Sequence, residues 1–418
     1  MATGMGLLAC PHCGTLHRRI PLDPGGAAVC CVCGSGLYRS SRLPLSAWIG
    51  LVLGALIVFA IANAFPIVTL TLQGLKINAS FPDALMLTWN NRDYGLAILT
   101  GLFGFWFPLT QLLVTLWALV VIRSGRLPAD FHWGMRLLSL SMPWSMVPVV
   151  MLAIIVAMVK FAGFAIVKIE PAIWAFAVLT VLFTVLARMT ARRLWIYAED
   201  AGLVIASHDK VLDAPCVGAC ECCGYLAPLS STSQAVSCPR CLSEIHYRHE
   251  QGRVRAWAFL LTASIAYLPA NILPIMRIRA VGTNQSHTIL GGVIELWQMG
   301  SWDLALIVFI ASVVVPITKL LALFVLLARI RWDGEGSQRQ RTRMYELVEF
   351  IGQWSMLDVF VVVLLGAMAN FSGLSQISAE PGAFAFGLVV VFTMFAAMSF
   401  DPRRGWDQRA SSSHPVIA

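Results

Sequence analysis

Eight apolar segments, most of them 20 residues or longer, constrain the fold of this chain more than any other feature. About 20 apolar residues in a helix span the roughly 30 Å hydrocarbon core of a bilayer. Charged residues make up only 12% of the chain, whereas about a quarter of a soluble domain is charged. We therefore expect an all-α polytopic membrane protein. The predicted spans are 47–68, 94–122, 137–158, 173–187, 256–276, 304–328, 347–368 and 383–400.

The basic residues predict the orientation of these spans. Placing both termini in the cytoplasm puts 23 Lys and Arg on that side, six on the other side, and Lys319 within a span. This excess agrees with the positive-inside rule. Both termini and both cysteine clusters are then cytoplasmic. No cleavable signal peptide is expected, because the first apolar run begins only near residue 47. The same distribution explains the net charge of +8 without a nucleic-acid partner.

The chain contains an internal repeat. The sequence N-A-F-P-I at 63–67 recurs as N-I-L-P-I at 271–275, a shift of 208 residues, and W-S-M at 144–146 recurs 210 residues later. Four spans per copy make both copies cross the membrane in the same direction, which is a parallel repeat. The predicted division is an N-terminal zinc ribbon at 1–42, a membrane module at 43–195, a second ribbon at 210–252, a second module at 253–406, and a polar tail at 407–418.

Short alternating segments predict a small β cap on the periplasmic side of each module. Residues 68–78 alternate apolar and polar side chains around Gln73-Gly74, which is typical of a hairpin. Residues 277–287 are a weaker counterpart in the second copy.

Two pairs of Cys-x-x-Cys knuckles predict two metal sites. In a reducing compartment such knuckles indicate metal binding rather than disulfides. Sixteen residues separate the two knuckles of the first pair, and fourteen separate those of the second. Two knuckles can close a tetrahedral four-thiolate site. Four sulfurs and no open position indicate structural zinc. The candidate ligands are Cys10, Cys13, Cys30, Cys33, Cys220, Cys223, Cys238 and Cys241.

Three cysteines remain outside these knuckles: Cys31, Cys216 and Cys222. They are spare thiols, replacement ligands or a redox switch, and the sequence does not decide among these interpretations.

Ionisable residues inside predicted spans are candidates for function, because their burial in lipid is costly. Lys319 lies deep in the sixth span, with Ser312 two turns earlier on the same helix face, and Asp358 lies one turn after Ser355 in the seventh. Thr393 lies in the eighth. These residues can converge in a four-helix module, where Lys319 and Asp358 would pair.

The first copy lacks this pair. Gln111 replaces the lysine and Pro148 the aspartate. The asymmetry favours function in the second module over an ion pair that only fixes helix packing, and both interpretations stay open.

Enzymatic chemistry is not expected. The sequence contains no G-x-x-x-x-G-K-[ST] phosphate loop, no H-E-x-x-H and no G-x-S-x-G.

Four stretches resemble the paraquat-inducible protein A family: C-P-H-C-G at 10–14, Y-L-P-A-N at 267–271, G-Q-W-S-M-L-D-V-F at 352–360, and F-D-P-R at 400–403. The resemblance implies a bacterial inner-membrane protein that works with a periplasmic MCE-domain partner, which forms a tunnel for phospholipid. It also implies that the polar cluster of the family falls on Ser312, Lys319, Ser355, Asp358 and Thr393. The first copy departs from the family at Pro148, where an acidic residue is usual.

Our leading hypothesis is a component that loads or extracts phospholipid at the inner-membrane end of such a tunnel, with protonation of Asp358 coupled to Lys319. The alternatives are a proton-coupled transporter of small molecules, a scaffold that does not transport, and a redox enzyme or sensor.

Overall fold

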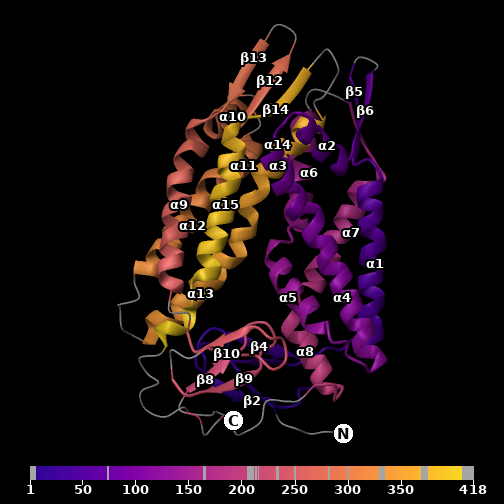
Figure 1. Cartoon of the computed structure of the whole chain (residues 1–418). Helices are drawn as coiled ribbons and strands as arrows, with labels where there is room; N and C mark the ends of the chain where they lie inside the picture. Colours follow the sequence, from indigo (N-terminus) through magenta and orange to yellow (C-terminus); the bar gives the residue numbers. More distant parts are fainter. Residues whose placement is uncertain are drawn as a thin grey trace.

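Two helical bundles lie side by side, with small sheets at both ends (Figure 1). We call the end with the cysteine clusters the ribbon end and the opposite end the sheet end. The structure, a computed structural model, describes residues 6–72, 75–162, 166–204, 211, 214, 216–231, 235–248, 251–280, 283–298, 300, 302–328, 335–368 and 375–406. The hairpin turn Gln73-Gly74 and the tail 407–418 lie outside these residues.

The first bundle is built from the N-terminal copy. Its elements are α1 (Leu45–Ala64), α3 (Tyr94–Gly101) with η1 (Leu102–Trp106) and α4 (Phe107–Ser124), α5 (Phe131–Ser141) with η2 (Met142–Trp144) and α6 (Val147–Ala162), and α7 (Pro171–Leu186). α1 packs against α4 and α7. It buries only a narrow stripe that includes Trp48, Val52 and Phe59, so most of its apolar surface faces outward, as expected for a helix that contacts lipid.

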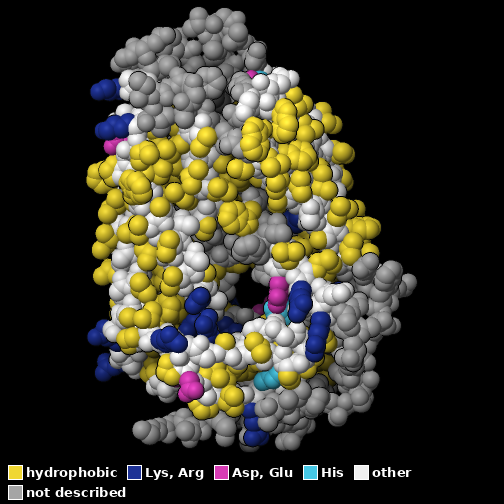
Figure 2. All heavy atoms as spheres, turned by 180° about the vertical axis from the view of Figure 1, so that it is seen from behind, with side chains coloured by type: hydrophobic (Ala, Val, Ile, Leu, Met, Phe, Trp, Pro, Cys, Tyr) yellow, Lys and Arg dark blue, Asp and Glu magenta, His cyan; other side chains and the backbone are white. Residues whose placement is uncertain are grey.

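The second bundle repeats this arrangement. Its elements are α9 (Gly252–Ile272), α11 (Trp302–Phe309) with η4 (Ile310–Val314) and α12 (Val315–Ala328), α13 (Glu335–Gly352) with η6 (Gln353–Met356) and α14 (Leu357–Met368), and α15 (Pro381–Ser399), followed by η7 (Pro402–Gly405). α15 packs along most of α9. The face of the molecule seen in Figure 2 is largely apolar between its two ends.

Five helical segments of the described chain are long and apolar enough to cross a membrane, which makes this a multi-pass membrane protein. They are 45–64, 94–124, 131–159, 305–328 and 381–399. The predicted spans 47–68 and 256–276 extend too far at their C-terminal ends, because β-strands begin at Val68 and Met276.

The other three predicted spans fall on helices that are not, by themselves, both long and apolar enough to count among these five. The fourth falls on α7, which bends by 56° into the short helix α8 (Ala191–Asp200); the predicted module boundary at residue 195 lies inside α8. The fifth falls on α9, whose first turn contains Arg253 and Arg255. The seventh is broken by η6, which leaves the 12-residue α14.

A π-helical turn interrupts the second span of each bundle just before a proline. The Phe107 N–H donates to the carbonyl of Leu102, and the Val315 N–H donates to that of Ile310, both five residues back. Proline removes a donor and clashes with the carbonyl four residues before it. The wider turn therefore accommodates Pro108 and Pro316 without ending the helix.

The sheet end carries two three-stranded antiparallel sheets. The predicted hairpins are confirmed as β5 (Val68–Leu72) with β6 (Leu75–Ala79) and β12 (Met276–Ala280) with β13 (Thr283–His287). A third strand was not predicted: β7 (Ile166–Ile169) pairs with β5, and β14 (Ser375–Ala379) pairs with β12. Two short helices, α2 (Phe81–Asn90) and α10 (Ile289–Gln298), follow the hairpins.

The bundles meet where α14 packs against α6 and α2. Phe360 of α14 is fully buried there, and its ring centroid lies 6.5 Å from that of Phe81. Towards the ribbon end the bundles separate, and Figure 2 shows an opening between them above the ribbons. The two bundles are thus joined near the sheet end and apart near the ribbon end.

Each cysteine cluster belongs to a ribbon of two hairpins. Ribbon 1 has β1 (Leu7–Ala9), β2 (Leu16–Arg18), β3 (Ala27–Val29) and β4 (Gly36–Arg39); ribbon 2 has β8 (Cys216–Ala219), β9 (Leu226–Leu229), β10 (Ala235–Ser237) and β11 (Glu244–His246). The ribbons pack on each other through a shared apolar core that includes Leu7 and Leu226.

Candidate functional site

Each knuckle is a tight turn that aims two sulfurs at one point. In the first, the Gly14 N–H donates to the Cys10 carbonyl at 2.9 Å, and the Cys10 N–H donates to the Thr15 carbonyl at 2.9 Å. The residue after the second cysteine has a positive φ in all four knuckles. Glycine adopts this conformation without strain, and it stands in three of the knuckles, whereas Leu242 occupies the fourth with φ 57°.

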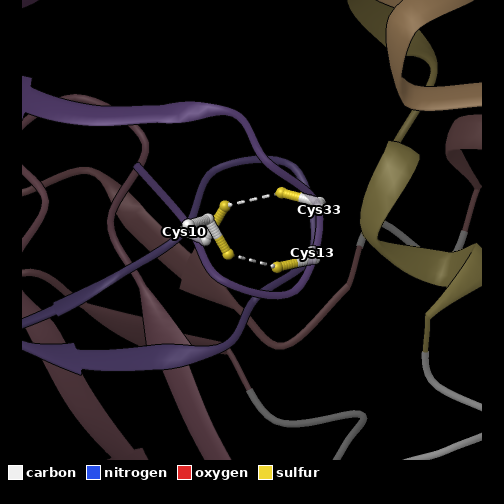
Figure 3. Close-up of side chains that lie close together, drawn as sticks. Cys10, Cys13 and Cys33 are labelled. Carbon is white, nitrogen blue, oxygen red and sulfur yellow. Dashed lines mark hydrogen bonds between the residues drawn. The ribbon is translucent and has the colours of Figure 1, made fainter. Parts of the chain in front are cut away.

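The predicted ligands come together in two buried clusters. In ribbon 1 the Cys10 and Cys33 sulfurs lie 3.5 Å apart, and so do those of Cys13 and Cys30 (Figure 3). In ribbon 2 the corresponding distances are 3.3 and 3.4 Å. Four sulfurs around a tetrahedral zinc at about 2.3 Å would be separated by about 3.8 Å. The two clusters therefore fit a metal ion of this size with small adjustments.

The sulfurs of each cluster shift one another's pKa in both directions. The Ser35 hydroxyl lies 2.9 Å from the Cys33 sulfur, and that of Ser243 lies 2.7 Å from Cys241. The thiol of Cys13 lowers the pKa of Cys10 to about 6, whereas the neighbouring sulfurs, Cys10 first, raise the pKa of Cys13. Thiolates, not thiols, bind metal, and a bound cation would offset the mutual repulsion of four thiolates packed this closely.

The three remaining cysteines stay outside the four-sulfur clusters. Cys31 is exposed and Cys216 is half-buried in β8. Cys222 is buried, and a hydrogen bond with Cys241 raises its pKa. By its position, Cys222 is not one of the four sulfurs of the cluster.

Arg192, in the first turn of α8, connects the ribbons to the first bundle. Its guanidinium donates to the Ala9 carbonyl at 2.9 Å, and its Nε lies 2.7 Å from where a Cβ at Gly224 would be. Gly224 follows a knuckle of ribbon 2, so one arginine contacts both ribbons. This role was not predicted, since nothing in the local sequence distinguishes Arg192 from Arg193.

The D-P-R sequence at 401–403 connects ribbon 2 to the second bundle. The Asp401 carboxylate accepts hydrogen bonds from the backbone N–H of Arg403 at 3.1 Å and from its Nε at 2.8 Å. The Arg403 guanidinium also reaches Glu221 of ribbon 2 at 2.9 Å. Ribbon 1 contacts the same bundle, because Trp406 packs against its cysteine cluster.

Lys319 is the most unusual residue inside the membrane region. Its side chain is only 2% exposed, and its ammonium has no hydrogen-bond partner among the residues that the structure describes. A Cβ at Gly352 would lie 3.1 Å from its Nζ. The expected ion pair with Asp358 is therefore not formed; the ammonium lies against the break between α13 and α14 instead.

The other predicted polar residues lie on η4, η6, α14 and α15 of the same bundle. Ser312, in η4, and Asp358, in α14, line a cavity of about 30 Å³ where the bundles meet, together with Val156 of α6. The Ser312 hydroxyl donates to the Val308 carbonyl at 2.7 Å, and the Thr393 hydroxyl donates to the Val390 carbonyl at 2.9 Å. The side chain of Ser355 lies outside the described part of the structure.

The first bundle holds a neutral version of this arrangement. Gln111, at the position of Lys319, is 5% exposed, and its carbonyl oxygen has no partner in the described structure. Met142 stands where the second copy has Gly352. A long side chain thus replaces the glycine where no lysine needs the space.

Comparison with known proteins identifies the family. The family model for paraquat-inducible protein A matches the chain twice, at residues 45–199 and 254–410. The chain belongs to the paraquat-inducible protein A family. The double match also confirms the tandem repeat.

Two relatives of the paraquat-inducible protein A family cover nearly the whole chain. "Intermembrane transport protein PqiA" of Escherichia coli (strain K12) is 31% identical, and the alignment covers 97% of each protein. "Lipophilic envelope-spanning tunnel protein A" of the same strain is 29% identical, covering 97% of this chain and 92% of that protein. No solved structure matches this family member.

Proposed function

We propose that this chain is the inner-membrane component of an MCE-type system that moves phospholipid between membranes. The names of its relatives, an intermembrane transport protein and an envelope-spanning tunnel protein, support this assignment. In this proposal the chain loads or extracts phospholipid at the inner-membrane end of a tunnel that a periplasmic MCE-domain protein forms. The opening between the bundles in Figure 2 is a route by which lipid reaches the interior.

The observation that carries the proposal is the buried ammonium of Lys319. An ionisable group in the apolar part of a bundle, without a carboxylate at ion-pair distance in the described chain, is costly to bury and is therefore a candidate for function. Its counterpart in the first bundle is the uncharged Gln111. We propose that Ser312, Lys319, Ser355, Asp358 and Thr393 form the transport site, and that proton transfer at Asp358 shifts the second bundle between two states.

The ribbons have a structural role in this proposal. We infer that each binds one zinc ion through its four cysteines, whose sulfurs lie together in one buried cluster. Four thiolate ligands would leave no open position for chemistry. In this proposal both ribbons and both termini lie in the cytoplasm and the small sheets lie in the periplasm, and the excess of basic residues near the ribbon end supports this orientation. The sheets would then be the elements nearest to an MCE-domain partner.

Two measurements test the proposal. Mass spectrometry of the chain purified gently from native membranes should find an MCE-domain protein and enriched phospholipid. Lys319→Ala and Asp358→Asn should abolish resistance of cells to detergent, whereas Gln111→Ala, at the matching position of the first bundle, should not. If purification at good yield recovers neither partner nor lipid, the protein is a transporter of small molecules. If the two variants protect cells as well as wild type, the proposed mechanism is wrong.

A further inference from the structure

A groove of about 940 Å³ lies between ribbon 1 and α8, and none of the predicted metal ligands or polar-cluster residues lines it. Its walls are the β3–β4 hairpin, the segment 19–22, the residues 40–43 that lead into α1, and one side of α8. Sites for small molecules have volumes of about 300–1,000 Å³. The groove has room for a lipid headgroup and the glycerol that carries it.

The charge of the groove is strongly positive. Five arginines and one aspartate line it, and only Arg19 pairs with that aspartate, Asp200, at 2.7 Å. The other four guanidinium groups have no carboxylate at ion-pair distance within the described chain. One of the four, Arg192, faces the cysteine clusters. The remaining three, Arg39, Arg188 and Arg193, leave positive charge that an anionic ligand would balance.

Aromatic rings hold one of these arginines in place. The Arg193 guanidinium lies 5.8 Å from the ring centroid of Trp48 and 5.7 Å from that of Tyr197. Trp48 is in the first turn of α1. The Arg193 Nη1 donates to the Arg188 carbonyl and its Nη2 donates to the Tyr197 hydroxyl, both at 3.4 Å. Its other N–H donors can bind phosphate oxygens.

The groove lies at the boundary of the membrane-spanning helices. Leu43 lines it two residues before α1 begins, and Arg188 lines it two residues after α7 ends. At a rise of at most about 3.6 Å per residue, both lie within about 7 Å of a helix end. Apolar side chains also line the groove and are exposed: Ile20 is 51% exposed, Val29 63% and Leu43 43%. Exposed apolar groups beside unpaired cations suit the surface of an anionic bilayer better than water.

We propose that this groove binds the phosphate-bearing headgroup of an anionic phospholipid from the leaflet at the ribbon end. Arg39, Arg188 and Arg193 contact the headgroup. Ile20, Val29 and Leu43 contact the glycerol and the first carbons of the acyl chains. The site lies between ribbon 1 and α8, and it does not depend on the transport function or on the polar cluster of the second bundle.

The test is native mass spectrometry of the full chain in detergent, titrated with phosphatidylglycerol and, separately, with phosphatidylethanolamine of the same acyl chains. Wild type should prefer phosphatidylglycerol. Arg39→Ala/Arg188→Ala should bind this lipid about 30-fold more weakly, because each basic residue at an anionic surface contributes about fivefold. Both side chains are exposed, so the fold should be kept.

The matched control is Arg123→Ala/Arg126→Ala. These two arginines are exposed at the same end of the molecule, near the end of α4, and do not line the groove. The control should bind phosphatidylglycerol like wild type. Equal losses in both double variants, or unchanged binding in the groove variant, would overturn the proposal. Displacement of the lipid from wild type by millimolar inorganic phosphate would assign the groove to a soluble anion instead.

Discussion

Gly352, the last residue of α13, is required by the side chain it faces rather than by its own backbone. Its φ of −54° and ψ of −35° are ordinary helical angles. A methyl group here would lie 3.1 Å from Nζ and 3.3 Å from Cε of Lys319, whereas unstrained contacts begin at about 3.5 Å. Lys319 is almost fully buried, so Gly352→Ala has to displace an ammonium that has little space to move.

Two opposing effects determine how much Gly352→Ala changes the free energy of unfolding. Overpacking a buried site costs about 1–3 kcal/mol, and replacing glycine by alanine in a helix gains about 0.5–1 kcal/mol. We predict that Gly352→Ala lowers the free energy of unfolding by about 1 kcal/mol. In a Lys319→Ala background the methyl group meets no ammonium, so the same change should stabilise. The two substitutions should therefore be coupled by about 1–3 kcal/mol.

The assay is thermal unfolding of wild type, both single variants and the double variant in one detergent. A change of about 1 kcal/mol shifts the midpoint by about 2–4 °C for a cooperative unit of about 150–250 residues. Gly54→Ala in α1 is the control for helix propensity, because a methyl group there contacts nothing within 4 Å. Additivity of the two substitutions within about 0.5 kcal/mol would refute the idea that Gly352 makes room for Lys319.

Three other substitutions give further predictions. Burial alone would raise the pKa of the Asp401 carboxyl, but the hydrogen bonds and charge of Arg403 outweigh burial and lower this pKa. A carboxylate with a lowered pKa stabilises the folded protein at neutral pH, and this stabilisation is lost as the pH falls through the lowered pKa. Asp401→Asn leaves Arg403 its contact with Glu221, so it should cost about 1.5–3 kcal/mol at neutral pH and flatten the acid dependence of thermal unfolding; an unchanged acid profile would contradict this. Gly14→Ala, at φ 79°, should weaken zinc retention in chelator competition by about 5–30-fold, whereas Gly36→Ala, with open space around it, should not. Gly382→Ala places a methyl group 2.5 Å from the Pro274 carbonyl oxygen and should lower the free energy of unfolding by about 1–3 kcal/mol; Gly387→Ala meets only flexible side chains, chiefly that of Leu99, and should be nearly neutral in the same thermal assay.

Local signals in the sequence predicted much of this architecture. Apolar length identifies the long spans, and the x-x spacing of cysteines identifies both clusters, because each signal lies within a few consecutive residues. The hairpins were predictable for the same reason. The third strand of each sheet was not, since β7 has only four residues and pairs with β5, which lies far earlier in the chain.

The polar cluster shows what helix contacts add to periodicity. Ser312 and Lys319 were expected on one face of the sixth span, and both side chains are buried. Ser312 lines the cavity with Asp358, while Lys319 lies against Gly352, six residues before Asp358 in the chain. This offset keeps the Lys319 amine from Asp358, and no local sequence signal gives it. The π-helical turn at Ile310–Val314 did have a signal in Pro316, because a proline inside an apolar span requires some local adjustment.

The contact between Trp406 and the first cysteine cluster has a consequence for biosynthesis. The ribosome makes ribbon 1 first, yet ribbon 1 finds part of its packing surface only when residue 406 has been made. At about 5–20 residues per second this delay lasts roughly 20–75 s. Until then the surface of ribbon 1 that Trp406 covers is exposed. Before residue 339 is made, the Val32 carbonyl also lacks the hydrogen bond that Arg339 donates. A chain truncated before Trp406 keeps this surface of ribbon 1 exposed. Quality-control proteases could recognise that surface, which is buried in the full-length protein.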